Sequence, residues 1–141
     1  MNILLVEDDY LLGRSTARLL EKAGQHRVRL THKAADVFKH CQSGAVDLVI
    51  MDVNLPGTFW QEEEVTGVDL SRMLKLQPRT ARVPVVLLSA NTTDSEQGRL
   101  MGEALADAIY SKPITDADEF LVLLIQVSGG RGFQGLTASA S

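Results

Sequence analysis

The stretch "ILLVEDDYLLGR", residues 3–14, decides the fold of this chain. Four apolar residues run directly into three consecutive carboxylates, Glu7–Asp9, and a helix-like pattern follows them. An apolar run without strict alternation is typical of a strand that is buried on both faces of a parallel sheet. Carboxylates repel one another and are costly to bury, so their position at the end of such a strand indicates a partner of opposite charge.

Four more short apolar runs follow, and each is separated from the next by a helix-like pattern. The runs are residues 27–31, 46–51, 83–88 and 108–110, and the helical patterns cover residues 12–23, 34–41, 70–74, 96–104 and 120–127. Alternation of this kind predicts βα units with right-handed crossovers. We therefore expect a doubly wound α/β fold, with a five-stranded parallel sheet and helices on both of its faces.

Composition excludes several classes of protein. The 141 residues, 45% hydrophobic and 23% charged, are ordinary for one globular domain. A net charge of −4 argues against a nucleic-acid surface, and the single cysteine, Cys41, excludes an internal disulfide and a cysteine-based zinc cluster. No apolar run reaches membrane-spanning length and no basic signal-peptide start is present, so we expect a cytoplasmic protein without membrane or direct nucleic-acid contacts.

Polar side chains end four of the five predicted strands. Glu7–Asp9 follow the first strand, Asp52 follows the third, Ser89 ends the fourth, and Lys112 ends the fifth. The carboxyl ends of parallel strands meet at one edge of the sheet, where such folds bind ligands. Clustered carboxylates suit Mg²⁺, and a carboxylate can also attack phosphorus. Because Lys112 and Ser89 can stabilise phosphoryl oxygens, the sequence predicts a phosphoryl-transfer site.

Four motifs at the strand ends occur in a specific order. They are "LLVEDD" at 4–9, "DVNLPG" at 52–57, "LLSA" at 87–90 and "SKPI" at 111–114. This set resembles the receiver domain of two-component response regulators over about residues 1–127. The resemblance implies a flavodoxin-like sheet with strand order 2-1-3-4-5 and five helices. It leaves residues 128–141 as a disordered tail or the start of a linker, so we expect a stand-alone receiver domain.

The resemblance also implies residue roles. Asp52 matches the phosphoacceptor, which takes a phosphoryl group from a histidine kinase or a histidine phosphotransfer protein. Ser89 matches the switch hydroxyl, and the small Ala90 beside it leaves room for the phosphoryl group. Lys112 matches the lysine that pairs with the phosphate, and Pro113 follows it in the family's turn.

Mg²⁺ is the cofactor that the resemblance implies. Asp8 would be a direct ligand, and Glu7 would act mainly through water. Asp52 and the backbone carbonyl of Asn54 would complete the protein ligands. Asp9 lies one place beyond the acidic pair, and we expect it to cap the first helix.

The position three residues before the lysine departs from the family pattern. The family usually has an aromatic residue there, whereas this chain has Ile109, followed by Tyr110. Neighbouring residues of a strand point to opposite faces. We therefore expect Ile109 to fill the position, unless a bulge brings Tyr110 into it.

The second departure is an insert, "TFWQEEEVT" at residues 58–66, before the glycine that opens the third helix, Gly67. One interpretation is a partner-selecting loop at the rim of the site, with Phe59 and Trp60 as anchors and Glu62–Glu64 as charges. The other is a tolerated surface elaboration whose tryptophan folds back onto the domain.

The implied function is that of a phosphoacceptor in a two-component system or phosphorelay, not of an enzyme that turns over an external substrate. Its output would be a phosphorylation-dependent change of the face formed by the fourth helix, fifth strand and fifth helix. That face would bind a downstream protein or a second copy of the chain.

Other functions fit the residues less well. A degenerate receiver that binds partners without phosphorylation is disfavoured by the complete set of predicted site residues. A Mg²⁺-dependent phosphohydrolase with an aspartate nucleophile usually carries a second aspartate two residues later, where this chain has Asn54. A flavodoxin-like redox module is disfavoured because the carboxylates after the first strand would repel the phosphate of a flavin. The histidines, His26, His32 and His40, are expected away from the site.

Overall fold

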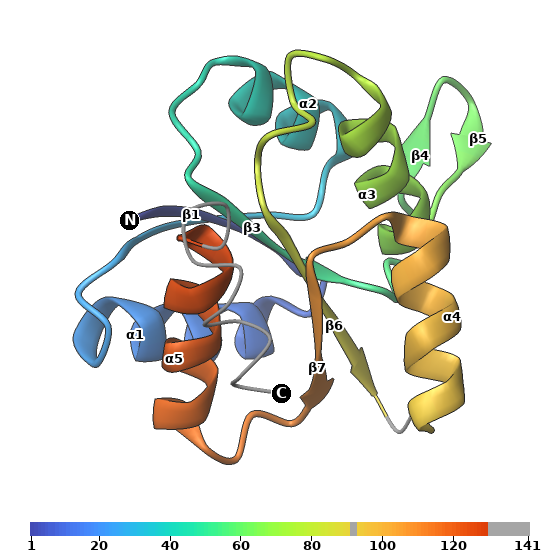
Figure 1. The fold of residues 1–141 in the computed structure, drawn as a ribbon. Helices are drawn as coiled ribbons and strands as arrows, with labels where there is room; N and C mark the ends of the chain where they lie inside the picture. The colour runs from blue at the N-terminus through green and yellow to red at the C-terminus, as the bar shows by residue number, and fades with distance from the viewer. Residues whose placement is uncertain (91–92, 130–141) are drawn as a thin grey trace.

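Within residues 1–90 and 93–129, which the computed structural model describes, five helices alternate with the strands of a five-stranded sheet (Figure 1). The strands of this sheet are β1 (Asn2–Val6), β2 (Arg27–Thr31), β3 (Leu48–Asp52), β6 (Val85–Ala90) and β7 (Ala108–Lys112). A separate hairpin consists of β4 (Phe59–Trp60) and β5 (Glu63–Glu64). The helices are α1 (Tyr10–Lys22), α2 (Ala34–Gln42), α3 (Gly67–Leu76), α4 (Asp94–Ala104) and α5 (Ala117–Ser128).

The strand order of the main sheet is β2-β1-β3-β6-β7, and every neighbouring pair is parallel. Because β4 and β5 belong to the hairpin, this order corresponds to the predicted 2-1-3-4-5. The flavodoxin-like fold class is therefore confirmed. All five residues of the central strand, β3, are buried, as expected for a strand covered on both faces.

The strands send alternate side chains into two separate cores, one on each face of the sheet. Leu4, Val6, Val49, Met51 and Leu87 pack with α2, α3 and α4, whereas Ile3, Leu5, Leu48, Ile50 and Leu88 pack with α1 and α5. Figure 1 shows the two groups of helices on opposite sides of the sheet. This arrangement leaves the carboxyl ends of the strands open for a site.

Side-chain caps fix where the helices begin. The Asp9 carboxylate accepts a hydrogen bond of 3.0 Å from the backbone N–H of Leu12, which confirms its predicted role at α1. Thr93 and Asp116 cap α4 and α5 in the same way. Thr66 forms a reciprocal capping box at α3. The helices that surround the site therefore have defined starting points.

Helix α4 differs from its neighbours in how it is anchored. Only Leu100 and Ala104 of this helix are buried, and its exposed side carries Gly98 and Gly102. Glycine lowers helix stability by about 1 kcal/mol relative to alanine. The helix is thus held mainly by two apolar side chains.

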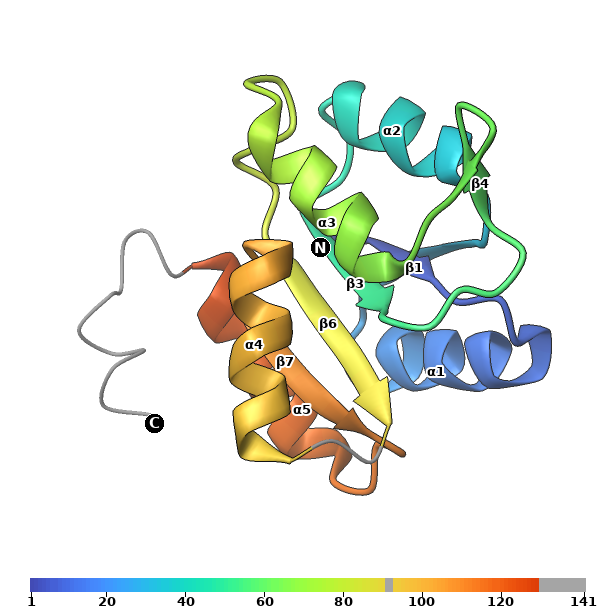
Figure 2. The same ribbon diagram turned by 90° about the vertical axis from the view of Figure 1, so that its right-hand side faces the viewer.

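The insert forms the β4–β5 hairpin and packs beside α2 (Figure 2). The Trp60 ring lies 4.5 Å from the Phe38 ring of α2, measured between centroids, so the tryptophan folds back onto the domain. Phe59 remains 59% exposed. The turn residues Gln61 and Glu62 have φ of 51° and 69°, a left-handed conformation that costs energy in residues other than glycine.

Helix α5 runs to Ser128, and the domain boundary expected near residue 127 stays a prediction. The prediction of a disordered tail falls mostly on residues 130–141, which lie outside the described residues. Across the part of the chain that the structure describes, none of the helices has the length and apolar character needed to cross a membrane.

Candidate functional site

A cleft of about 470 Å³ lies at the carboxyl edge of the sheet, and we call it the acidic cleft. It is lined by Glu7, Asp8, Asp9, Leu12, Asp52, Val53, Asn54, Pro56, Ser89, Ala90, Leu100 and Lys112. All six predicted site residues, from four strand ends, are therefore together. Of the apolar members, Ala90 was predicted to lie at the site, whereas the others were not, because their apolar character is ordinary in a core.

Gly67 positions the segment that carries Asp52. Its N–H donates to the carbonyl oxygen of Val53 at 3.0 Å, which holds the start of α3 against the end of β3. A Cβ at position 67 would collide with the carbonyl oxygen of Asp52. Only glycine allows the two backbones to approach so closely.

Two buried carboxylates share the ammonium of Lys112. Its Nζ lies 2.6 Å from Asp52 Oδ2 and 3.1 Å from Glu7 Oε1. The other carboxylate oxygens accept hydrogen bonds from backbone N–H groups, Asp52 Oδ1 from Asn54 at 3.0 Å and Glu7 Oε2 from Asp9 at 3.2 Å. Asp52 and Glu7 are only 4% and 5% exposed, so Lys112 is their main source of positive charge.

Burial and crowding change the acid–base behaviour of the cleft. Burial, followed by the hydrogen bond and negative charge of Asp52, raises the pKa of Glu7 from 4.5 to about 7. Burial lowers the pKa of Lys112, but the hydrogen bonds and charges of Asp52 and Glu7 outweigh this effect, and the pKa is raised. The lysine therefore stays charged at neutral pH.

Three carboxylates are placed to share one cation. One oxygen each of Glu7, Asp8 and Asp52 lies within 4.8 Å of the others, and Asp8 is exposed. Mg²⁺ prefers hard oxygen ligands, takes one or two carboxylates directly and keeps several waters, through which a further carboxylate can act. The residues present therefore fit the predicted metal.

Strand register decides which residue occupies the switch position. Leu87 pairs with Ile109 and Leu88 with Tyr110, and the pairing continues without a bulge to Lys112. Ile109 packs on the face that α4 covers, whereas Tyr110 belongs to the opposite core. The structure thus agrees with the expectation that Ile109 fills this position.

Tyr110 has a different set of contacts. Its ring lies 4.9 Å from that of Phe120, and its hydroxyl donates to Glu119 Oε1 at 2.9 Å. Burial, followed by the hydrogen bond and charge of Glu119, raises the Tyr110 pKa to about 12. On the other face, Gln97 Nε2 of α4 donates to Ser111 Oγ at 2.8 Å. This hydrogen bond could not be predicted from the sequence, because glutamine and serine are ordinary surface residues.

The sequence model of the response regulator receiver domain matches residues 3–124. The chain belongs to the receiver domain family. Receiver domains are phosphoacceptors of two-component signalling, which interact with histidine kinases or phosphotransfer proteins and bind Mg²⁺ at an acidic site. They are signalling proteins that do not turn over an external substrate.

Curated relatives of this receiver domain include longer regulators. It is 32% identical to the gliding motility regulatory protein of Myxococcus xanthus over 112 residues, which are 79% of this chain and 13% of that protein. It is 40% identical to the uncharacterized transcriptional regulatory protein YbdJ of Bacillus subtilis over 103 residues, or 72% of this chain and 41% of that protein. The receiver domain therefore spans less than half the length of both relatives.

Solved structures share the receiver fold. The signal receiver domain of a signal transduction histidine kinase from Syntrophus aciditrophicus matches with a TM-score of 0.71 and 25% identity, over 92% of this chain and 90% of that one. The receiver domain of sensor histidine kinase PA1611 from Pseudomonas aeruginosa, with a magnesium ion in its active site cleft, matches with a TM-score of 0.74 and 24% identity. That match covers 91% of this chain and 97% of the other.

Proposed function

We propose that Asp52 is the phosphoacceptor of this receiver domain and that Glu7, Asp8, Asp52 and the Asn54 carbonyl hold Mg²⁺. The observation that carries the proposal is the contact of 2.6 Å between Lys112 Nζ and Asp52 Oδ2. It places a buried nucleophile and a cation at the same edge of the sheet, beside carboxylates that can share a metal. The phosphoryl donor is a histidine kinase or a histidine phosphotransfer protein.

The transfer step is a displacement at phosphorus. A carboxylate oxygen of Asp52 attacks the phosphoryl group of a phosphohistidine, and a P–O bond forms as the P–N bond breaks. The electron pair of the broken bond stays on the imidazole nitrogen of the donor. The Lys112 ammonium offsets the negative charge on the phosphoryl oxygens, and the Ser89 hydroxyl donates a hydrogen bond to one of them.

The metal ligands divide into direct and indirect ones. Asp8 is the exposed carboxylate and binds the ion directly, whereas Glu7 is buried against Lys112 and acts mainly through water. When bound, Mg²⁺ supplies positive charge that offsets the charge of the acceptor and the phosphoryl group. The protein's own contribution is to keep these carboxylates in place before the donor arrives.

The output surface is the face formed by α4, β7 and α5. Lys112 ends β7, and the neighbouring Ser111 is bonded to Gln97 of α4, so a change at Lys112 reaches α4 through one residue. Val122 and Ile125 of α5 are 53% and 59% exposed and offer apolar contact area. A downstream protein or a second copy of the chain binds this face after phosphorylation.

The hairpin selects the phosphoryl donor. Pro56 lines the acidic cleft, so the hairpin begins at the rim of the cleft, where Phe59 and the run Glu62–Glu64 are exposed. This surface fits a donor with basic residues around an apolar contact. Replacing residues 59–64 with a short glycine-containing loop is expected to reduce transfer from the kinase and to leave acetyl phosphate labelling unchanged. Equal effects on the two donors would contradict this role.

The test of the main proposal is incubation with acetyl phosphate, with and without Mg²⁺, followed by intact-mass measurement. We expect one phosphoryl adduct that needs Mg²⁺ and is lost in Asp52→Asn. The control is Asp118→Asn, which removes an exposed carboxylate outside the cleft and should label like the wild type. If no adduct forms under any condition, the chain is a degenerate receiver and the proposal fails.

A further inference from the structure

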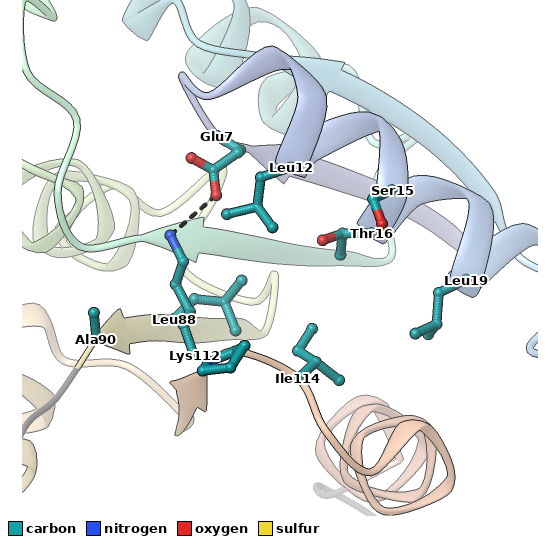
Figure 3. A pocket seen from close by; sticks show the side chains of 10 residues that line it. Glu7, Leu12, Ser15, Thr16, Leu19, Leu88, Ala90, Lys112 and Ile114 are labelled. Carbon is teal, nitrogen blue, oxygen red and sulfur yellow. Dashed lines mark hydrogen bonds and ion pairs between the residues drawn. The ribbon is translucent and has the colours of Figure 1, made fainter.

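A second cavity, of about 400 Å³, lies between α1 and the turn that leads from β7 to α5 (Figure 3). We call it the α1–α5 pocket. Leu12, Leu19 and Ile114 contribute apolar walls, whereas Glu7 and Lys112 form its polar end. Pockets of this size, mostly apolar with a few polar groups at one end, are typical of small-molecule sites.

The hydroxyl of Thr16 points into this pocket. Thr16 of α1 is 8% exposed, and its hydroxyl, for which no hydrogen bond is found among residues 1–90 and 93–129, is open to the space of the pocket. Threonine in a helix can bond the carbonyl one turn earlier, and buried hydroxyls generally find a partner. Figure 3 shows the Thr16 oxygen directed into the pocket, on the side of Leu12. A hydroxyl at the wall of a mostly apolar cavity is one of the few polar groups that can orient a bound ligand.

The charges at the polar end favour a positive head group. Three carboxylates, Glu7, Asp8 and Asp52, lie around one ammonium, that of Lys112. When neither a metal ion nor a phosphoryl group is bound, the carboxylates outnumber this ammonium, which lies between Asp52 and Glu7. Negative charge is therefore in excess where the pocket meets the acidic cleft, and it attracts cations.

We propose that the α1–α5 pocket binds a small organic cation with a compact apolar body. Its donor head group lies between the Thr16 hydroxyl and the Glu7 carboxylate, and its body lies against Leu19 and Ile114. Because Glu7 and Lys112 also line the acidic cleft, the bound cation contacts the residues that surround Asp52. The domain thus has a small-molecule input in addition to its phosphoryl donor, a function beyond the proposed one.

The probe is benzamidinium, tested against two molecules of nearly the same shape, neutral benzamide and anionic benzoate. Each is titrated into the ¹⁵N-labelled full chain with a chelator present. We expect benzamidinium to shift the amide signals of Thr16, Leu19 and Ile114 in a saturable manner. Benzamide should bind at least about fivefold more weakly, and benzoate should cause no saturable shift at these residues.

Variants separate the pocket from the rest of the surface. Thr16→Val keeps the shape of the side chain, removes the hydroxyl and should weaken benzamidinium binding by about fivefold or more. Thr115→Val makes the same change at an exposed residue outside the pocket and should bind like the wild type. Ile114→Ala shortens one wall and should also weaken binding, so the test does not depend on one variant.

Three outcomes of the probe titrations would overturn the proposal. They are the absence of saturable binding, equal binding of all three probes, and binding of benzoate at least as strong as that of benzamidinium. Unchanged affinity in folded Thr16→Val would also overturn it. None of these measurements involves a phosphoryl group, so they are independent of whether Asp52 accepts phosphate.

Discussion

The ammonium of Lys112 lies 2.6 Å from the carboxylate of Asp52, although 60 positions separate the two residues in the chain. Asp52 ends β3 and Lys112 ends β7, and only β6 lies between these strands in the sheet. The contact therefore depends on the strand order, and it neutralises a carboxylate that the fold has buried. Removing either partner leaves a charge in a poorly hydrated place.

Lys112→Met is expected to destabilise the protein most above neutral pH. The change leaves Glu7 and Asp52 facing each other without their cation, and breaking such a buried pair costs about 3–5 kcal/mol. The loss should be smaller at pH 5, because Glu7 is then protonated. Urea unfolding at pH 5 and pH 8 measures both values.

Arg99→Met provides the control for this experiment. Arg99 pairs with Glu103 on the surface of α4, where both side chains are more than half exposed. Removing this pair should change the unfolding free energy by less than about 0.5 kcal/mol at either pH. If Lys112→Met behaved like Arg99→Met, the lysine would not be compensating buried charge.

Lys112→Ala should separate phosphorylation from its structural consequence. Asp52 and the metal ligands remain, so acetyl phosphate should still add a phosphoryl group. We expect the amide signals of Gln97 and Ser111 to shift on phosphorylation of the wild type and to move much less in the variant. Equal shifts in the two proteins would show that Lys112 does not connect the cleft to α4.

Glu7 should make the protein less stable as the pH rises. Its folded-state pKa of about 7 lies above the ordinary 4.5, so the folded state binds the proton more tightly. The stability of the wild type relative to Glu7→Gln should therefore fall between pH 4.5 and 7, by at most about 3 kcal/mol, and then level off.

The comparison with Glu7→Gln also cancels the contributions of other titrating groups to the pH dependence of stability. The pKa of His26 is lowered by burial and by the N-terminal amino group, which favours stability at higher pH. This contribution is the same in both proteins and cancels in the difference. A difference that is constant from pH 4.5 to 8 would mean that Glu7 titrates normally.

Asp8→Asn should weaken Mg²⁺ binding by about tenfold or more, since it removes the exposed carboxylate of the three-carboxylate group. Without metal the variant should be as stable as the wild type or slightly more so, because one repulsive charge is gone. Calorimetric titration with Mg²⁺ and thermal unfolding in chelator give the two results. Marked destabilisation in chelator would argue against repulsion among these carboxylates.

Gly67→Ala should destabilise the domain by about 1–3 kcal/mol, because the new methyl group must displace the backbone at Asp52. Gly98→Ala is the matched control, since nothing lies within 4 Å of its added Cβ. That change in an exposed helix should stabilise by about 0.4–1 kcal/mol. Chemical denaturation of both variants tests the contrast, which disappears if Gly67 is not closely packed.

Most of the fold could be predicted because three of its strands, β1, β3 and β6, are continuous apolar runs that lead into polar residues. The positions of Asp52, Ser89 and Lys112 at the ends of predicted strands also placed them at one edge of the sheet, where the structure has them lining one cleft. The raised pKa of Glu7 could not be predicted in this way. It depends on how deeply the side chain is buried and on its contact with Asp52.

The hairpin could not be predicted, for a local reason. Its strands have two residues each, too few for alternation to be visible, and the turn uses Gln61 and Glu62. Two-residue hairpin turns usually carry Asn-Gly or a similar pair, because these residues tolerate positive φ. The contact between Trp60 and Phe38 holds the hairpin on α2, and no pattern in the sequence predicts this contact.

The sparse anchoring of α4 has a consequence for motion. A helix held by Leu100 and Ala104, with two glycines on its exposed side, needs little free energy to open locally. Its amide hydrogens should therefore exchange with solvent faster than those of α2, which buries four side chains over a shorter length. Under the proposed function, a change at the acidic cleft would therefore reach a helix that opens locally at a lower free-energy cost than α2.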